Sequence, residues 1–231
     1  MDIIRTHSKR SQQLIDTEVL LHKFQEQPAR TMLLYGNSAV FKASLLIGGM
    51  LNKPVAVIDG AIRFNSYTLS HIAKLLNVPS KELLKRTYIT RSFTAFQTEA
   101  AITTKLVNFL KRNPCPLVIV LGLLDTYYDE QVKSHECLQS LRRIFQTFNT
   151  LVKNNIHILL ADVDVMKPPA GKEQLFPFLY NAVNVVMSLQ PDEHGLQFKE
   201  ERRTQLWGGT TIPLRSLSTA TEKHGVNFAE R

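Results

Sequence analysis

The sequence predicts an α/β protein in which helices cover both faces of a mainly parallel β-sheet. Its 231 residues are 44% hydrophobic and 21% charged, which is enough apolar material to bury the core of one large domain. Short runs of consecutive apolar residues alternate with helical segments, the order that βαβ units produce. Because βαβ crossovers are right-handed, these units favour a doubly wound, three-layer sandwich.

The expected parallel strands are short and rich in Val, Ile and Leu. They lie at 32–35, 55–59, 87–90, 117–121 and 156–161. The helices between them carry apolar residues at helical spacing. They are expected at 42–51, 68–76, 80–86, 96–111 and 137–153.

The two ends of the chain depart from this alternation. Residues 11–24 predict a one-faced helix within an N-terminal arm over 1–30. Strands joined by short Gly-containing turns follow near the other end, and such strands form antiparallel hairpins. They are expected at 182–189, 196–205 and 211–214. We therefore expect a core over 31–214 and a C-terminal tail over 215–231.

Composition argues against several classes of protein. The longest apolar runs, 117–124 and 156–161, are far shorter than the ~18 residues of a membrane span. The N-terminus lacks the apolar segment of a signal peptide, so we expect an intracellular protein, nuclear in a eukaryote and cytoplasmic in a prokaryote. Cys115 and Cys137 have no metal-site spacing, and we expect neither a metal nor a cofactor.

The positive charge is concentrated in the first half. Residues 31–113 contain eleven Lys or Arg and three Asp or Glu, which accounts for the whole net charge of +8. Such asymmetry indicates an acidic partner, and DNA is the commonest one. A solvated basic surface is the alternative.

The segment after the first strand is similar to a phosphate-binding loop, G-x-x-x-x-G-K-[ST]. Gly36 and Lys42 occupy the positions of the first glycine and the lysine. Phe41 replaces the second glycine and puts a ring where backbone must approach phosphate, while Ala43 replaces the Mg²⁺-binding hydroxyl. The sequence therefore predicts a degenerate phosphate loop.

Three further segments, in the same order, resemble the RecA/Rad-type recombinase core, including its Rad-like accessory paralogs. Residues 58–69, I-D-G-A-I-R-F-N-S-Y-T-L, are similar to the family's I-D-T-E-G-x-F-x-x-x-x-L. Residues 117–127 are similar to L-L-I-V-D-S-x-x-x-x-Y, and residues 155–163 to G-V-x-V-V-I-T-N-Q. The resemblance covers about residues 30–190 and implies a RecA-like P-loop NTPase core with antiparallel C-terminal hairpin strands.

The resemblance also implies that the catalytic positions are lost. Ala61 stands where the family has its activating glutamate, Leu121 where it has a metal-organising aspartate, and Val163 where it has a sensing glutamine. Phosphoryl transfer depends on positioned charge, so we expect a pseudo-ATPase. Asp59 and Asp125 lie nearby and are the candidates that could take over metal binding.

In the family, the loops after the central and sensor strands contact DNA, and here they are 122–131 and 164–181. The first is acidic, which weakens the analogy. The second combines cations with aromatic residues, which suits single-stranded DNA. The candidate DNA-binding residues are Lys167, Lys172, Phe176, Phe178 and Tyr180, together with Arg202 and Arg203 on a predicted hairpin. The alternatives are aromatic residues that cover the end of the sheet and a charge ladder on an exposed edge.

Residues 217–222, L-S-T-A-T-E, are similar to the F-T-T-A-T-E words with which Rad-type recombinases attach to a neighbouring core. Leu217 and Ala220 are therefore candidate partner-binding residues, although the family carries this word ahead of the core. A polar tail is the alternative.

The most economical hypothesis is a non-catalytic RecA-like module of DNA recombination or repair that binds DNA and a RecA-like partner or a second copy of itself. One alternative is a divergent paralog that binds ATP with the help of a partner subunit. Another is a protein-only scaffold of the same fold.

Overall fold

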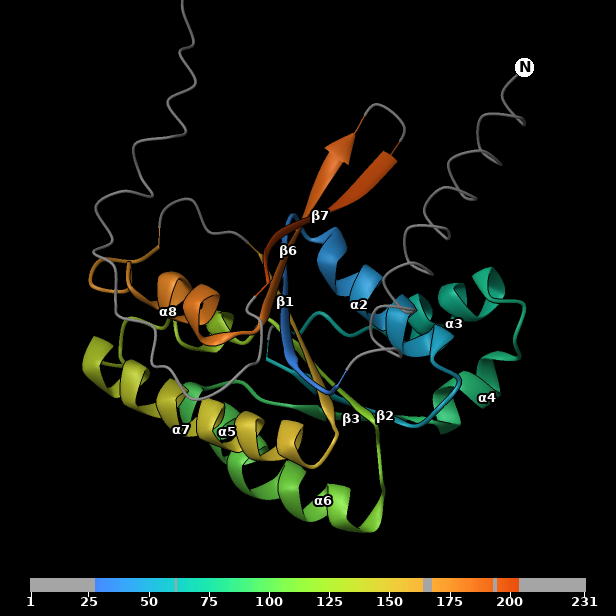
Figure 1. Cartoon of the computed structure of the whole chain (residues 1–231), viewed down its shortest axis with the longest axis horizontal. Helices are drawn as coiled ribbons and strands as arrows, with labels where there is room; N and C mark the ends of the chain where they lie inside the picture. Colours follow the sequence, from blue (N-terminus) through green and yellow to red (C-terminus); the bar gives the residue numbers. More distant parts are fainter. Residues whose placement is uncertain (1–27, 61, 164–167, 193–194, 204–231) are drawn as a thin grey trace, which may run out of the picture.

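The computed structural model of the chain describes residues 28–60, 62–163, 168–192 and 195–203, which contain one seven-stranded β-sheet (Figure 1). The strand order is β3-β2-β4-β5-β1-β6-β7. All neighbouring strands are parallel except β6 and β7, which form an antiparallel pair at one edge. The strands are β1 (Thr31–Gly36), β2 (Val55–Asp59), β3 (Thr87–Arg91), β4 (Leu117–Leu121), β5 (His157–Val163), β6 (Val185–Asp192) and β7 (Gly195–Arg203).

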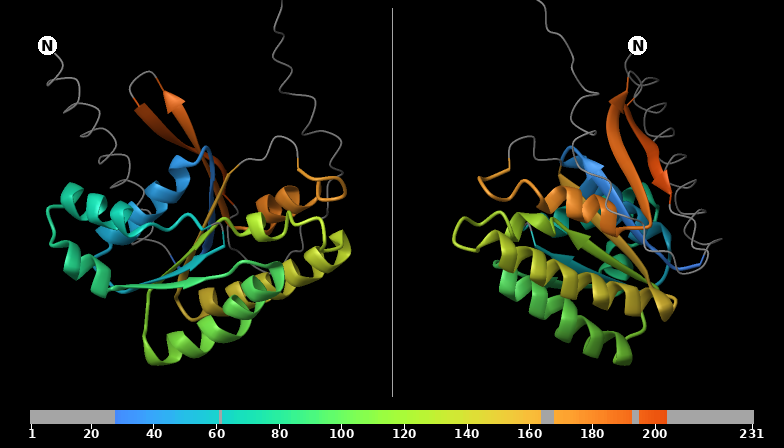
Figure 2. Two further views of the ribbon diagram at one scale, coloured as in Figure 1. Left: turned by 180° about the vertical axis from the view of Figure 1, so that it is seen from behind. Right: turned by 60° about the vertical axis from the view of Figure 1, so that its left-hand side comes forward.

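Helices cover both faces of this sheet and produce three layers (Figure 2). One face packs against α2 (Ala39–Met50), α3 (Ser66–Leu75) and α4 (Ser80–Lys85). The other packs against α5 (Ala95–Ala100), the π-helical segment η1 (Ala101–Leu106), α6 (Val107–Arg112), α7 (Ser134–Lys153) and α8 (Leu175–Ala182). The predicted α/β class, with a mostly parallel sheet and an antiparallel pair, is confirmed.

The central strand β4 shows why its sequence is apolar throughout. Val118 and Val120 belong to one core cluster, whereas Leu117, Ile119 and Leu121 belong to the cluster on the opposite face. Successive side chains of a strand point to opposite faces, so a strand covered on both sides contains no solvent-facing position.

One predicted helix and one predicted loop differ from the structure in detail. The predicted helix over 96–111 is present, but its middle turn, Ala101–Leu106, is π-helical. Such wide turns are frequent at functional sites. The predicted loop over 164–181 is wrong in its second half, because α8 begins at Leu175. The expected helix at 11–24, the strand at 211–214 and the tail at 215–231 lie outside the described residues. None of the helices in the described ranges is both long enough and apolar enough to cross a membrane.

Candidate functional site

The turn between β1 and α2 occupies the place of the degenerate phosphate loop. Helix α2 begins at Ala39, earlier than predicted, and its first N–H groups are already bonded. Ala39 N donates to Asn37 Oδ1 over 2.9 Å, and Val40 N donates to Asn37 O over 3.1 Å. Phe41 N donates to Ser38 O over 3.4 Å. A phosphate loop needs such N–H groups to point at its ligand, whereas here the turn itself satisfies them.

Phe41 is part of the core. Its ring is 5% exposed and packs in the cluster beneath α2, and the Arg63 guanidinium carbon lies 5.4 Å from the ring centroid. The helical arrangement leaves Lys42 exposed and Ala43 half-buried. Ser44 Oγ donates to Val40 O over 2.8 Å and satisfies its hydroxyl within the helix. Phe41, at the position of the second glycine, is thus a packing residue of the core.

Gly36 has a structural explanation that needs no phosphate. Its φ is +143°, and a Cβ atom there would lie 2.4 Å from the backbone oxygen of Leu189 on β6. Only glycine permits this approach. Gly36 also pairs with Val163, one of the three positions that lack the family's catalytic residue. Leu121 is fully buried at the end of β4, and Ala61 lies outside the described residues.

Asp59 caps the turn that follows β2. Its Oδ1 accepts from Arg63 N at 2.8 Å, and its Oδ2 accepts from Phe64 N at 3.1 Å. Arg91 Nε lies 3.3 Å from the same Oδ2. Both oxygens are therefore engaged in local structure. In the part of the chain that the structure describes, no group of three His, Cys, Asp or Glu side chains is arranged to hold a metal.

Asp162 is the unexpected polar residue of the sheet. It lies on β5, fully buried, and its Oδ1 accepts from Leu124 N at 3.3 Å, while its Oδ2 has no partner among the residues that the structure describes. Burial, with a smaller contribution from the nearby Asp125 carboxylate, raises the pKa of Asp162 well above its ordinary value. Burial also raises the pKa of Asp125, against the effect of Arg63, whose Nη2 lies 3.7 Å away. A carboxylate inside an apolar strand is the sequence signal that could have identified this position.

Lys172, a candidate DNA-binding residue, is buried rather than exposed. It is 3% exposed, and its Nζ donates to Val132 O and to Cys137 Sγ, the latter over 3.0 Å. The ammonium group thus ties the segment ahead of α8 to the start of α7. A cation used in this way is not available to a phosphate.

The aromatic residues of the same segment pack on the protein, as the structural alternative anticipated. Phe176 and Tyr180 pack with their rings 5.4 Å and 6.2 Å from the ring of Tyr35 on β1. Phe178 contacts Phe145 of α7 at a centroid distance of 5.7 Å. All three candidates lie on α8 and are half-buried.

The remaining candidates stay predictions. Arg202 and Arg203 lie on β7, where their backbones pair with Val186 and Val185, as the predicted hairpin requires. Lys167, Leu217 and Ala220 lie outside the described residues.

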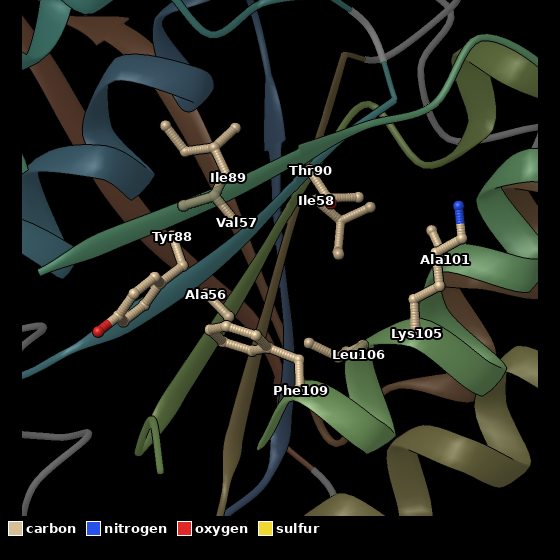
Figure 3. Close-up of a pocket in the computed structure, with 10 residues that line it drawn as sticks. All are labelled: Ala56, Val57, Ile58, Tyr88, Ile89, Thr90, Ala101, Lys105, Leu106 and Phe109. Atoms are coloured by element: carbon tan, nitrogen blue, oxygen red, sulfur yellow. The ribbon is translucent and has the colours of Figure 1, made fainter. Parts of the chain in front are cut away.

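A cavity of about 210 Å³ opens beside β3, at the opposite edge of the sheet (Figure 3). In the described part of the chain β3 pairs only with β2, so its other side is an unpaired edge. Tyr88 and Ile89 are partly exposed on this strand, and Lys105 of η1 is the only charged residue in the lining. The lining residues are Ala56, Val57, Ile58, Tyr88, Ile89, Thr90, Ala101, Lys105, Leu106 and Phe109.

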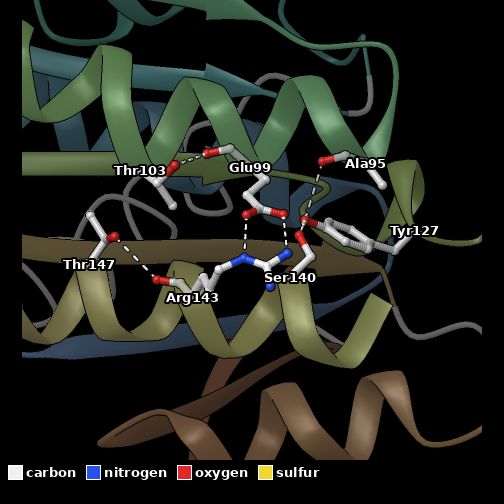
Figure 4. A network of polar contacts seen from close by, with 7 residues as sticks. All are labelled: Ala95, Glu99, Thr103, Tyr127, Ser140, Arg143 and Thr147. Carbon is white, nitrogen blue, oxygen red and sulfur yellow. Dashed lines mark hydrogen bonds and ion pairs between the residues drawn. The ribbon is translucent and has the colours of Figure 1, made fainter. Parts of the chain in front are cut away.

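A polar network connects α5, which precedes the η1 segment of the cavity, with α7 (Figure 4). Arg143 on α7 binds Glu99 on α5 through two bonds, Nε to Oε1 at 2.5 Å and Nη2 to Oε2 at 2.9 Å. The hydrogen bond from Arg143 lowers the pKa of Glu99. The Tyr127 and Ser140 hydroxyls lie 2.6 Å apart in the same interface, and Tyr127 also donates to Ala95 O. These contacts fix α5 on α7.

The fold and these sites define an α/β protein whose sheet is compatible with a RecA-like core. The chain matches no known protein family and no curated protein sequence. Its function must therefore be argued from its own residues.

Proposed function

We propose that this chain is a non-catalytic RecA-like module of DNA recombination or repair, which works by binding DNA and a RecA-like partner chain. The observation that carries the proposal is the unpaired β3 edge beside an apolar cavity. A parallel sheet is normally closed at its edges by charge, by short strands or by a partner. Here the edge presents Tyr88 and Ile89, each 37% exposed, next to a cavity that would take an apolar side chain.

An extended segment of a second chain is the partner that fits this edge. Strand addition supplies main-chain hydrogen bonds, and a pocket beside the strand reads alternate side chains. Lys105 at the cavity favours a segment that carries an acidic residue next to its apolar anchor. The L-S-T-A-T-E word of residues 217–222 contains both an apolar Leu217 and an acidic Glu222, and a second copy of the chain would supply it.

The β1–α2 turn supports the non-catalytic part of the proposal. Its N–H groups bond to Asn37 and Ser38, and Phe41 fills the core at the position of the second glycine. These bonds support a turn that does not hold a phosphate. We therefore propose that the module acts by binding and does not turn over ATP.

A protein-only scaffold is the second candidate function. The burial of Lys172 and the packing of the α8 aromatic rings favour it, because four of the seven predicted DNA contacts are engaged in packing within the protein. A salt-dependent shift of labelled single-stranded DNA would favour the first candidate, and no shift at low salt would favour the scaffold.

Site-specific photo-cross-linking tests the pairing directly. With p-benzoylphenylalanine at position 89 of the full chain, we expect a cross-link to a RecA-like chain, whether a second copy or another protein. The same group at position 84, on exposed Leu84 of α4, is the matched control and should give none. Pairing at the β3 edge would be contradicted if position 89 gave no cross-link to a RecA-like chain. It would also be contradicted if position 84 gave an equally strong one.

A further inference from the structure

Three aromatic side chains point into solvent where β2 and β3 end. Tyr67 is 81% exposed, and Phe93 and Phe96 are each 63% exposed. In the described residues no ring contact involves any of them. Single apolar residues on a surface are ordinary, but three large rings that follow two neighbouring strands form a shared feature.

Arg91 joins the segments that carry these rings. Asp59 at the end of β2 is the register partner of Arg91 at the end of β3, and the two side chains form an ion pair. Arg91 Nη2 also donates to Phe64 O over 2.9 Å, which ties the end of β3 to the segment leading to Tyr67. Arg63, in the same segment, has a half-exposed side chain. We call Arg63, Tyr67, Arg91, Phe93 and Phe96 the aromatic surface.

Buried and capping hydrogen bonds hold the segment of Phe93 and Phe96 in place. The Thr98 hydroxyl bonds to Ser92 Oγ at 2.9 Å and to Thr126 Oγ1 at 2.9 Å, both in the interior. Thr94 caps α5 by accepting from Gln97 N, and the Gln97 side chain accepts from Phe93 N over 2.9 Å. These reciprocal bonds resemble a capping box.

The segment of Tyr67 is equally well fixed. Asn65 caps α3 by accepting from Tyr67 N at 2.9 Å. Because the backbone that carries these exposed rings is already held in place, little backbone entropy is lost when a ligand binds.

From this geometry we infer that the aromatic surface is a binding site for single-stranded nucleic acid, whose bases stack on Tyr67, Phe93 and Phe96 while Arg63 and Arg91 approach the backbone. Stacking on exposed rings beside cations is the chemistry by which proteins bind single strands. The surrounding charge agrees, since residues 60–98 contain six Lys or Arg and one Glu. An acidic protein surface would use the cations but has no bases to stack.

This inference rests on the proposed DNA role and moves that role from the α8 segment to the opposite part of the sheet. Fluorescence anisotropy of the full chain with a labelled oligothymidylate tests it. We expect saturable binding that weakens as salt rises. Phe93→Leu and Phe96→Leu should each weaken binding about tenfold, whereas Phe93→Tyr, which keeps a ring, should bind like the wild type. Arg63→Gln should reduce the salt dependence by about one counterion.

The controls separate this inference from the pairing proposal. Leu84→Ala, an exposed substitution on α4, should leave the affinity unchanged. Absence of binding at low salt, leucine variants that bind like the wild type, or competition by polyglutamate as strong as by unlabelled oligothymidylate would each overturn the inference. A position-89 cross-link that persists in the Phe93→Leu, Phe96→Leu double variant would then show that only the nucleic-acid site had failed.

Discussion

The carboxyl ends of β1 and of β2 and β3 lie on the same edge of one sheet, yet the sequence treats aromatic and charged residues in opposite ways there. After β1, the aromatic residue is buried and the cation is exposed, since Phe41 is 5% exposed and Lys42 faces solvent. After β3, the cation is paired and the aromatic residue is exposed, since Arg91 binds Asp59 and Phe93 is 63% exposed. Ligands of parallel sheets bind at such edges, so the contrast bears on function.

The difference shows that turns at one edge of a sheet can place their aromatic residues in opposite environments. In the β1–α2 turn the N–H groups of Ala39, Val40 and Phe41 are bonded within the turn, and Phe41 fills the core. The β2 and β3 turns satisfy their donors equally well but leave rings outside. Of the two arrangements, only the second leaves large aromatic rings exposed to solvent.

The largest expected effect comes from Phe41→Gly, which restores the second glycine of the phosphate loop. Removing the buried ring should cost about 3–5 kcal/mol of unfolding free energy, measured in urea. Nucleotide binding should not return, because the N–H groups of the turn stay bonded. Phe41→Leu should lose much less stability and serves as the control. A nucleotide-dependent rise in Tm of the glycine variant would break the contrast between the two regions.

Asp162→Asn should have the next largest effect, on the strand between β1 and β4. The raised pKa means that the folded chain holds this proton more tightly than the unfolded chain does. Stability from this group is therefore present at low pH and falls as pH rises above about 4, by up to about 1.4 kcal/mol per pH unit until the folded pKa is passed. The variant should lack this decline. Its free energy of unfolding, relative to that of the wild type, should therefore rise with pH.

Denaturation of Asp162→Asn at several pH values checks this, with exposed Glu130→Gln as the control. Parallel pH profiles of wild type and variant would mean that Asp162 is ionised without penalty.

Thr98→Val tests the segment after β3 that carries Phe93 and Phe96. It leaves the buried hydroxyls of Ser92 and Thr126 with one partner fewer, at a cost of about 1–2 kcal/mol. It should also weaken oligothymidylate binding less than Phe93→Leu does, because the rings remain but are held less firmly. Equal binding by Thr98→Val and wild type would show that a fixed segment is not needed.

Arg143→Gln should have the smallest effect, a slight fall in Tm. The lowered pKa of Glu99 means that the ion pair stabilises the fold above the ordinary pKa of glutamate, and that this contribution is lost as pH falls through the lowered value. An exposed pair contributes little in any case. Arg142→Gln, at an exposed neighbouring position, is the matched control, and an equal fall in both variants would discount the pair.

The sequence predicted the fold well because strands covered on both faces must be apolar throughout. An entirely apolar strand such as Leu117–Leu121 fits only the interior of a sheet that is covered on both faces. The positions of polar side chains were harder to predict. A cation with nearby aromatic residues gives the same sequence pattern whether the segment is an exposed loop or is packed against the core. Lys172 and Phe178 suited a DNA contact by composition. In the fold, however, Lys172 is buried against Val132 and Cys137, and Phe178 packs against Phe145, all distant in sequence.

The aromatic surface was missed for the same reason. Tyr67, Phe93 and Phe96 stand singly in the sequence, and it is the pairing of β2 with β3 that places their segments side by side.

A phosphate-release assay with the full chain tests the central claim most directly, that the β1 end of the sheet is closed to nucleotide chemistry. We predict no turnover of ATP above background, with or without single-stranded DNA, and no difference between wild type and Lys42→Ala. Turnover that DNA stimulates and Lys42→Ala abolishes would contradict the account.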